Sequence, residues 1–239
     1  MTASLRDIKV YTTYPHSCSY LEDQEAVTLF VDPKHTVDKA LYSSLSGLGF
    51  RRSGSHIYRP HCEACNACIP SRIPVAEFRM SRGQRRTWNR NQDLVVEESE
   101  TIIDDAAYQL YTNYIEMRHK DGDMYPPVRE QYESFLNNPW QCTRYYRFYL
   151  PENGQQTLVA IAVADFLDDG QSAIYTFFDP TQEKRSLGTY TILWQVDNAR
   201  NSGLNYLYLG YWIRNCQKMS YKTSYRPLEL RINNSWSAV

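Results

Sequence analysis

The stretch SAIYTFFDPTQEKRSLGTYTILWQ, residues 172–195, decides the fold class. Residues 172–180 are mostly apolar, aromatic or β-branched and end in Asp-Pro, which predicts a strand. Apolar residues then recur at helical spacing over 188–201, so a helix is expected after the strand. Because the intervening loop leads into a helix N-terminus, we expect its unpaired backbone N–H groups to face a phosphate or a polarised carbonyl above the sheet.

The sequence around this unit extends it into a mixed α/β layer structure. The nearly all-apolar segment 157–167 predicts a central strand, and further strands are expected at 144–150 and 204–213. Helical patterns cover 104–119 and 127–137. Such a mixture of helices and strands excludes a barrel or an all-β sandwich.

The first hundred residues predict a second, smaller domain that carries most of the cysteines. Its expected elements are a strand at 27–33, a helix over 37–48 capped by Thr36, a hairpin around Ser53-Gly54, a short helix opened by Ser81 and a strand at 94–100. We therefore expect two domains, 1–100 and 101–239.

The composition is that of an ordinary globular protein. The chain has 239 residues, of which 42% are hydrophobic and 22% are charged, so disorder and collagen-like repeats are excluded. No stretch approaches the roughly 20 apolar residues of a membrane-spanning helix. The opening residues lack the apolar core of a secretory signal. We therefore expect a cytoplasmic protein without a membrane partner.

The near-neutral net charge of −1 hides a strongly basic stretch. Between residues 51 and 90 nine arginines stand against Glu63 and Glu77, which leaves a local charge of +7 and −8 for the rest of the chain. Arginine presents a planar fork of donors that suits phosphate and stacks on bases. The stretch predicts binding of a polyanion; the simpler alternative is a solvated basic face.

Three of the six cysteines form the motif C-x2-C-x2-C at Cys62, Cys65 and Cys68. This spacing lets neighbouring thiolates face one centre, as zinc and iron–sulfur sites require. Cys18 is the candidate fourth ligand, with His16 and His61 as other candidates. The alternative is a set of reduced structural thiols around a tight loop.

Long segments of the chain resemble the bacterial branch of the aminoacyl-tRNA–protein transferases, the aspartate/glutamate leucyltransferases. The resemblance is carried by YSSLSGLGFRRSGSHIYRPHCEACNACIPSRI, SAIYTFFDPTQEKRSLGTYTILWQ and LYLGYWIRNCQKMSYKTSYRP, and it spans residues 11–236. It implies transfer of leucine from leucyl-tRNA to proteins that begin with Asp or Glu, which marks them for N-degron degradation. It also implies a C-terminal GNAT-like acyltransferase domain behind a smaller cysteine-bearing domain.

The resemblance leaves a metal or cluster open. Eukaryotic relatives bind an iron–sulfur cluster or haem through N-terminal cysteines that begin with a C-x2-C pair. Here Cys18 is followed by Ser19, Tyr20 and Leu21, so that pair is absent, and the triple Cys62, Cys65 and Cys68 stands instead. Zinc, an iron–sulfur cluster or no metal at all are each compatible with the sequence.

The implied reaction needs few catalytic side chains. The aminoacyl ester is already activated, and an α-amine has a pKa of about 7.7–8.0, so positioning supplies much of the acceleration and no cofactor is required. Backbone N–H groups near Arg185 and Gly188 are the candidates for stabilising the oxyanion. The candidate proton acceptors are Asp179, Tyr208 and Tyr221.

The implied substrates suggest further site residues. Fixed positive charge for the acceptor carboxylate is expected from Arg214, Lys218 and Lys222, and Asp121 and Asp123 are candidates for holding its ammonium group. An apolar pocket for leucine is expected near Phe177, Ile192 or Trp194. The tRNA acceptor end, rather than DNA, is the expected partner of the basic stretch, through Arg51, Arg52, Arg59, Arg82, Arg85, Arg86 and Trp88.

Three alternatives stay open from the sequence. The same fold could transfer arginine instead of leucine. The arginines and cysteines alone would suit a zinc-stabilised RNA-binding module without catalysis. A coenzyme A-dependent N-acetyltransferase is disfavoured, because the loop QEKRSLG holds one glycine where such enzymes carry two or more.

Overall fold

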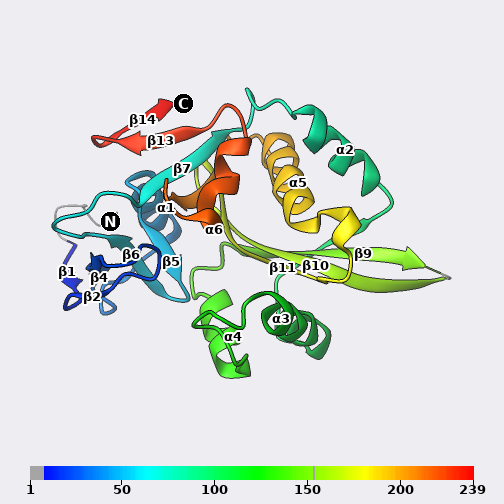
Figure 1. Ribbon diagram of the computed structural model, residues 1–239, viewed down its shortest axis with the longest axis horizontal. Helices are drawn as coiled ribbons and strands as arrows, with labels where there is room; N and C mark the ends of the chain where they lie inside the picture. Colours follow the sequence, from blue (N-terminus) through cyan, green and yellow to red (C-terminus); the bar gives the residue numbers. More distant parts are fainter. Residues whose placement is uncertain (1–7, 153) are drawn as a thin grey trace.

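Two sheets of unequal size make up most of the fold in the computed structural model, which describes residues 8–152 and 154–239. The larger sheet has eight strands in the order β14-β13-β7-β12-β11-β10-β9-β8. The smaller sheet has four strands in the order β1-β4-β6-β5 and lies at one end of the molecule (Figure 1). A two-stranded ribbon pairs β2 with β3.

The elements follow the chain in a simple order. The strands are β1 (Val10–Thr12), β2 (His16–Ser17), β3 (Glu25–Ala26), β4 (Thr28–Val31), β5 (Arg51–Ser53), β6 (His56–Pro60), β7 (Ile69–Pro74), β8 (Val95–Ser99), β9 (Thr143–Glu152), β10 (Gln155–Phe166), β11 (Gly170–Phe178), β12 (Tyr206–Trp212), β13 (Glu229–Ile232) and β14 (Ser235–Ala238). The helices are α1 (Lys39–Gly47), α2 (Arg82–Arg90), α3 (Asp105–Arg118), α4 (Arg129–Leu136), α5 (Leu187–Asn201) and α6 (Gln217–Ser220), with 3-10 turns η2 (Glu183–Arg185) and η3 (Tyr221–Ser224).

Helices cover both faces of the large sheet. Helices α2 and α5 lie on one face and α3 and α4 on the other (Figure 1). Because its middle is covered on both sides, β10 carries an unbroken buried run from Val159 to Asp165. The expected central strand at 157–167 is therefore confirmed, as is the strand–loop–helix unit of β11 and α5.

Local capping explains where the helices begin. Ser81 and Gln84 form a reciprocal capping box at the start of α2, so the predicted helix start is confirmed. Helix α1 begins after Asp38, whose carboxylate accepts a hydrogen bond from the Leu41 N–H at 2.8 Å. The expectation that Thr36 caps this helix was wrong, because Asp38 provides the acceptor three residues before that N–H.

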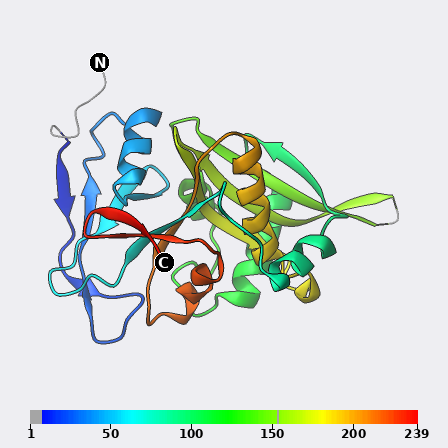
Figure 2. The same ribbon diagram turned by 90° about the horizontal axis from the view of Figure 1, so that it is seen from above.

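The large sheet takes strands from both halves of the chain. Strand β7 pairs with β12 and β13, and β8 pairs with β9. The boundary predicted near residue 100 therefore does not separate the two sheets. Elements after residue 68 build onto the larger sheet, which places α2 beside α5 (Figure 2).

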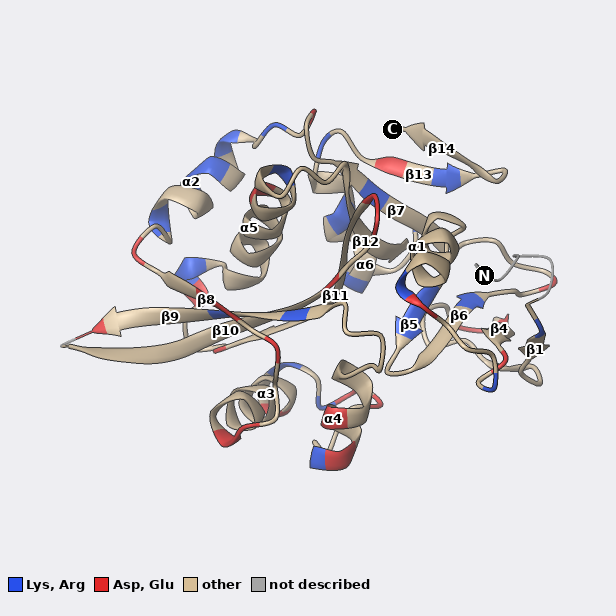
Figure 3. Cartoon of the chain, turned by 180° about the vertical axis from the view of Figure 1, so that it is seen from behind, with Lys and Arg blue, Asp and Glu red and all other residues tan. Residues whose placement is uncertain are grey.

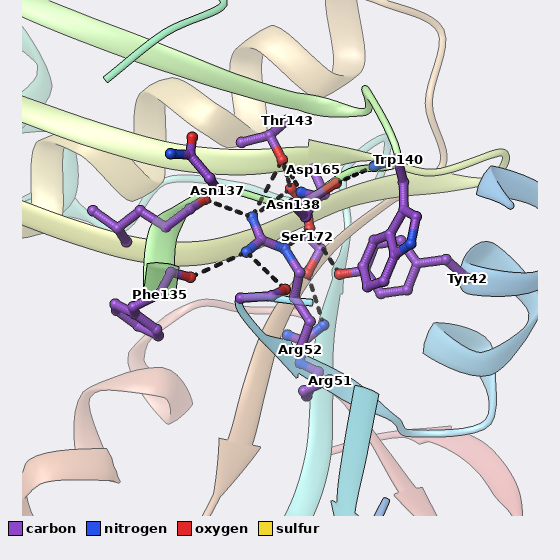
Figure 4. A network of polar contacts seen from close by, with 12 residues as sticks. Tyr42, Arg51, Arg52, Phe135, Asn137, Asn138, Trp140, Thr143, Asp165 and Ser172 are labelled. Atoms are coloured by element: carbon purple, nitrogen blue, oxygen red, sulfur yellow. Dashed lines mark hydrogen bonds and ion pairs between the residues drawn. The ribbon is translucent and has the colours of Figure 1, made fainter. Parts of the chain in front are cut away.

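A buried polar network joins the small sheet to the large one. Arg52 of β5 forms an ion pair with Asp165 of β10, with both side chains fully buried. The same carboxylate accepts hydrogen bonds from Tyr42 and Thr143, and Arg52 also donates to the carbonyl of Leu136 (Figure 4). These contacts fix β5, and with it the neighbouring Arg51, against the large sheet.

No helix in the described part of the chain has the length and apolar character needed to cross a membrane.

Candidate active site

The parallel pairing of β11 with β12 ends part-way along both strands. Its register runs from Gly170 opposite Tyr206 to Ser172 opposite Tyr208. Strand β12 has an irregularity between Tyr208 and Gly210, where its register with β7 shifts, and Gly210 has a φ of +83°. A left-handed residue at an irregularity of this kind favours glycine. The open end of the strand pair is the candidate active site.

Two buried cations meet at the base of this opening. Arg51 is 7% exposed and Lys222 is 4% exposed. A Cβ atom placed on Gly210 would lie 3.7 Å from Nε and Nη2 of Arg51 and 3.7 Å from Nζ of Lys222. Two cationic side chains from distant parts of the chain therefore converge on the one position of β12 that carries no side chain.

Within the described structure, the two cations do not use all of their N–H donors in hydrogen bonds. Arg51 donates through Nη1 to the Ser172 hydroxyl at 3.0 Å, whereas its buried Nη2 has no partner among the described residues. Lys222 donates to the carbonyl of Tyr211 and approaches Sδ of Met219 at 3.3 Å. Burial, together with the positive charge of Arg51, lowers the pKa of Lys222 to about 7.

Aromatic side chains surround the opening. The ring of Tyr114 lies 5.0 Å from that of Phe178 and 6.4 Å from that of Tyr175. Tyr221 is 46% exposed, and its ring centroid lies 5.7 Å from Nζ of Lys222. These rings form a surface on which a base or an apolar side chain can pack.

The predicted loop before α5 is held in place by the segment that follows α2. The Arg185 guanidinium forms two hydrogen bonds with the Asp93 carboxylate, at 2.9 and 2.8 Å, and these bonds raise the pKa of Arg185. Its donors are thus largely engaged. Gly188 lies in the first turn of α5 beside the Phe178 ring, and no described side chain caps this helix. The backbone N–H of Arg185 donates to the Gln182 carbonyl at 3.0 Å, so the N–H groups of the first turn of α5, around Gly188, are the predicted ones placed to bind a polar group.

The candidate proton acceptors are not brought together. Oδ1 of Asp179 accepts from the backbone and hydroxyl of Thr181, at 2.9 and 2.7 Å. Tyr208 is fully buried and donates to Asp169 at 2.8 Å, so its assignment as a catalytic residue was wrong: its hydroxyl is engaged and its ring packs in the core beneath the small sheet. Desolvation raises the pKa of Tyr221 to about 12 despite its partial exposure, which disfavours a role as a base near neutral pH.

Among the predicted acceptor-binding residues, Lys222 alone points inward. Lys218 and Asp121 pair with each other at 2.9 Å, and both are exposed. This pair ties α6 to the loop between α3 and α4, and it neutralises the charges that were expected to hold the substrate. Asp123 and Arg214 are exposed as well.

The basic stretch divides into buried and exposed arginines. Arg52 is buried in its ion pair with Asp165, so the prediction that it contacts tRNA was wrong. Trp88 also packs inward, with its ring 5.7 Å from that of Tyr190, and it is not free to stack on a base. Arg59 is half-buried over the ring of Phe50. The exposed arginines line α2 and the residues before it (Figure 3): Arg79, Arg82, Arg85, Arg86 and Arg90.

Sequence reasoning missed how Arg51 and the aromatic rings are used. A charge count cannot separate Arg51, which faces the opening, from Arg52, which does not. The one available signal was Gly210 within an otherwise apolar strand, because an isolated glycine in a strand marks a bulge or a close approach.

Comparison with known proteins agrees with this architecture. The N-terminal model of the arginine-tRNA-protein transferases matches residues 16–86, and the C-terminal model of the same family matches residues 106–232. An aspartate/glutamate leucyltransferase of Teredinibacter turnerae is 53% identical over 97% of this chain and 94% of its own length. Another, from Stutzerimonas stutzeri, is 54% identical over 98% and 97% of the two chains.

The chain belongs to the arginine-tRNA-protein transferase family, among its aspartate/glutamate leucyltransferases. It is accordingly a transferase, and the expected family is confirmed. The solved structure of FemX matches with a TM-score of 0.50 at 9% identity, over 90% of this chain and 82% of that chain. This likeness concerns the fold alone, and it supports the expected GNAT-like acyltransferase architecture.

The four cysteines suspected as ligands share one pocket in this member of the transferase family. Cys18, Cys62, Cys65 and Cys68 line a depression of about 410 Å³ beside β6 and β7. Burial and the neighbouring thiols raise the pKa of Cys68 to about 12. In residues 8–152 and 154–239, no three His, Cys, Asp or Glu side chains are arranged to hold a metal ion. As placed, the thiols do not fit a metal; the zinc or iron–sulfur site stays a prediction that metal analysis of the purified transferase can test.

The residues suggested for the leucine pocket of this transferase pack between the sheet and its helices: Phe177 and Ile192 are buried, and Trp194 is partly buried against the same layer. A leucine pocket beside them stays a prediction. A separate cavity of about 350 Å³ lies between the β5–β6 hairpin and helices α3 and α4. Tyr111, Met124 and Phe135 supply its apolar wall, and Met124 also touches the Tyr175 hydroxyl at 3.3 Å.

Proposed function

We propose that this transferase moves leucine from leucyl-tRNA to the α-amino group of proteins that begin with Asp or Glu. The observation that carries the proposal is identity of 53–54% over nearly the whole chain to proteins named aspartate/glutamate leucyltransferases. The geometry is compatible with it, because an aromatic surface and a pair of buried cations meet where β11 and β12 diverge. The new N-terminal leucine would then mark the acceptor for degradation in the cytoplasm.

The chemistry is an aminolysis of an ester. The neutral α-amine attacks the leucyl carbonyl, an amide bond forms, and the ester bond to the terminal ribose of the tRNA breaks. The proton lost by the amine ends on the released ribose oxygen. Because the ester is already activated, holding amine and carbonyl in contact supplies much of the rate, and we propose that the reaction uses no cofactor.

The residues of this chain would contribute by binding and orientation. Exposed arginines on α2 offer phosphate contacts for the acceptor stem. Tyr114 and Tyr221 border the opening, where a base of the single-stranded CCA end can stack. The uncapped first turn of α5, around Gly188, offers N–H groups for the developing oxyanion.

The test uses purified protein, a peptide that begins with Asp and tRNA charged with labelled leucine or labelled arginine. A peptide that begins with Lys is the control. Label that moves only from leucyl-tRNA and only to the Asp peptide is the expected result. Transfer of arginine instead would overturn the donor assignment while keeping the reaction class. Binding of tRNA without transfer from either donor would favour a non-catalytic RNA-binding protein.

A further inference from the structure

Arg51 and Lys222 are two buried basic side chains, and no residue in the described part of the chain gives either of them an acidic partner. None of the ion pairs within the described residues includes either side chain. Proteins almost never bury lysine or arginine unless it is paired, because loss of hydration is costly. This costly arrangement lies at the end of the β11–β12 pairing, so it is explained by an anion that binds there.

We propose that Arg51 and Lys222 together bind the side-chain carboxylate of the acceptor's N-terminal Asp or Glu, at the base of the opening between β11 and β12. The inference rests on the proposed function, and it names the residues that would make the enzyme select acidic N-termini. Arg51 comes from β5 of the small sheet and Lys222 from η3, so two distant parts of the chain contribute to one subsite.

The donors available match a carboxylate. Arg51 uses Nη1 for Ser172, and its buried Nη2 finds no partner within residues 8–152 and 154–239. Lys222 uses its amine for Tyr211 and Met219, which leaves one further direction for a third contact. One oxygen can thus accept from each side chain, as in other charge-assisted pairs. Gly210 leaves this point beside the cations unfilled, because a Cβ there would meet no heavy atom of the described structure, outside its own residue and chain neighbours, closer than 3.7 Å, and the atoms at that distance belong to Arg51 and Lys222.

The position of the pair favours a small acidic side chain over a tRNA phosphate. Both cations are more than nine-tenths buried, whereas the exposed arginines of α2 lie on the outside of the large sheet's helical layer. A phosphodiester would bring two riboses into this confined place. A carboxylate on a short side chain brings no comparable bulk to the two cations.

A role of Lys222 in proton transfer would affect the acceptors differently from a role in carboxylate binding. A lysine that accepted the proton of the attacking amine would be needed equally for every acceptor, whatever its first side chain. A lysine that binds the carboxylate matters far more for Asp and Glu than for the uncharged Asn. Comparison of matched Asp and Asn acceptors therefore separates the two roles.

The experiment measures the affinity of the full-length protein for two fluorescent peptides that differ only in Asp or Asn at position 1. The proteins are wild type, Lys222→Met, Arg51→Met and Lys222→Arg, with Lys39→Met as a matched control at an exposed lysine on α1. We expect wild type and control to bind the Asp peptide at least about tenfold more tightly. In Lys222→Met and Arg51→Met the preference should approach one, chiefly through loss of affinity for the Asp peptide. Lys222→Arg keeps the charge and should retain part of the preference.

Transfer assays and circular dichroism complete the test. A preference that stays intact in folded Lys222→Met and Arg51→Met overturns the proposal. The proposal is also overturned if Lys222→Met loses transfer to both peptides equally while its binding preference for the Asp peptide is unchanged. That result would assign Lys222 to proton transfer. If wild type transfers leucine to the Asp peptide while either result holds, the proposed function survives and this inference alone fails. If wild type transfers nothing to either peptide, both fail.

Discussion

Nε of Arg52 lies 2.6 Å from Oδ2 of Asp165, and the two residues are 113 positions apart in the chain. A second bond joins Nη2 to Oδ1 at 2.9 Å. The pair fixes β5 against β10, and since Arg51 is the next residue, it also sets where that guanidinium enters the opening. Arg52 is thus a positioning residue, and its neighbour faces the candidate acceptor subsite.

Replacement of one partner of this pair should destabilise the protein strongly. Asp165→Asn leaves the Arg52 charge buried without its counter-ion, which typically costs about 3–5 kcal/mol. Urea unfolding at pH 7 checks the value. Asp168→Asn is the control, because Asp168 pairs with Lys39 at 3.8 Å on the surface and such pairs contribute at most about 1 kcal/mol. Equal effects of the two substitutions would contradict the importance assigned to the buried pair.

Lys222→Met should make the folded protein more stable while it damages acceptor selection. The fall in the Lys222 pKa from 10.5 to about 7 corresponds to about 4–5 kcal/mol of unfavourable burial. Methionine fills similar space without charge, so we expect a gain of at least about 1 kcal/mol at pH 6. Lys120→Met, at an exposed position, is the control and should change stability by less than about 0.5 kcal/mol.

The gain from Lys222→Met should depend on pH in a defined direction. Between pH 7 and 10.5 the unfolded chain retains the lysine proton that the folded chain has released, so wild-type stability rises with pH there. Arg51, Cys216 and Cys68 are the charged or titratable groups that act on this amine. The advantage of the variant is therefore largest below pH 7 and shrinks toward pH 10. Urea unfolding of both proteins at pH 6 and pH 9 measures it, and an advantage that grows with pH would disprove the assignment.

Local patterns in the sequence were sufficient for most elements, whereas the site depended on contacts between distant residues. Ser81 with Gln84, the apolar run of β10 and the β11–α5 unit each carry their signal within a few residues. Arg51 and Arg52 are both buried, and which of them faces the opening depends on Ser172 and Asp165, more than a hundred residues away. A count of charges along the sequence does not show which arginines are buried, so the whole basic stretch was predicted to bind tRNA.

Reversal of charge on α2 should weaken tRNA binding and flatten its dependence on salt. The triple change of Arg82, Arg85 and Arg86 to Glu removes up to three phosphate contacts, which should lower the slope of log affinity against log salt by about 2–3. Filter binding of tRNA at salt concentrations from about 50 to about 200 mM measures this slope. The matched control changes Lys9, Lys34 and Lys39 to Glu, three exposed lysines of the small sheet's side. If the control lowers the slope as much, α2 is not the contact surface.

Gly188 tests whether the start of α5 belongs to the active site. A Cβ on Gly188 would lie 3.1 Å from Cε1 of Phe178, so Gly188→Ala requires a small ring shift and should keep most of the activity. Gly188→Trp must displace Phe178, and with it Tyr114, whose ring lies 5.0 Å away. We expect Gly188→Trp to abolish leucyl transfer while the far-UV circular dichroism stays close to wild type. Wild-type turnover by the folded Trp variant would exclude this turn, and the oxyanion role given to its N–H groups, from the mechanism.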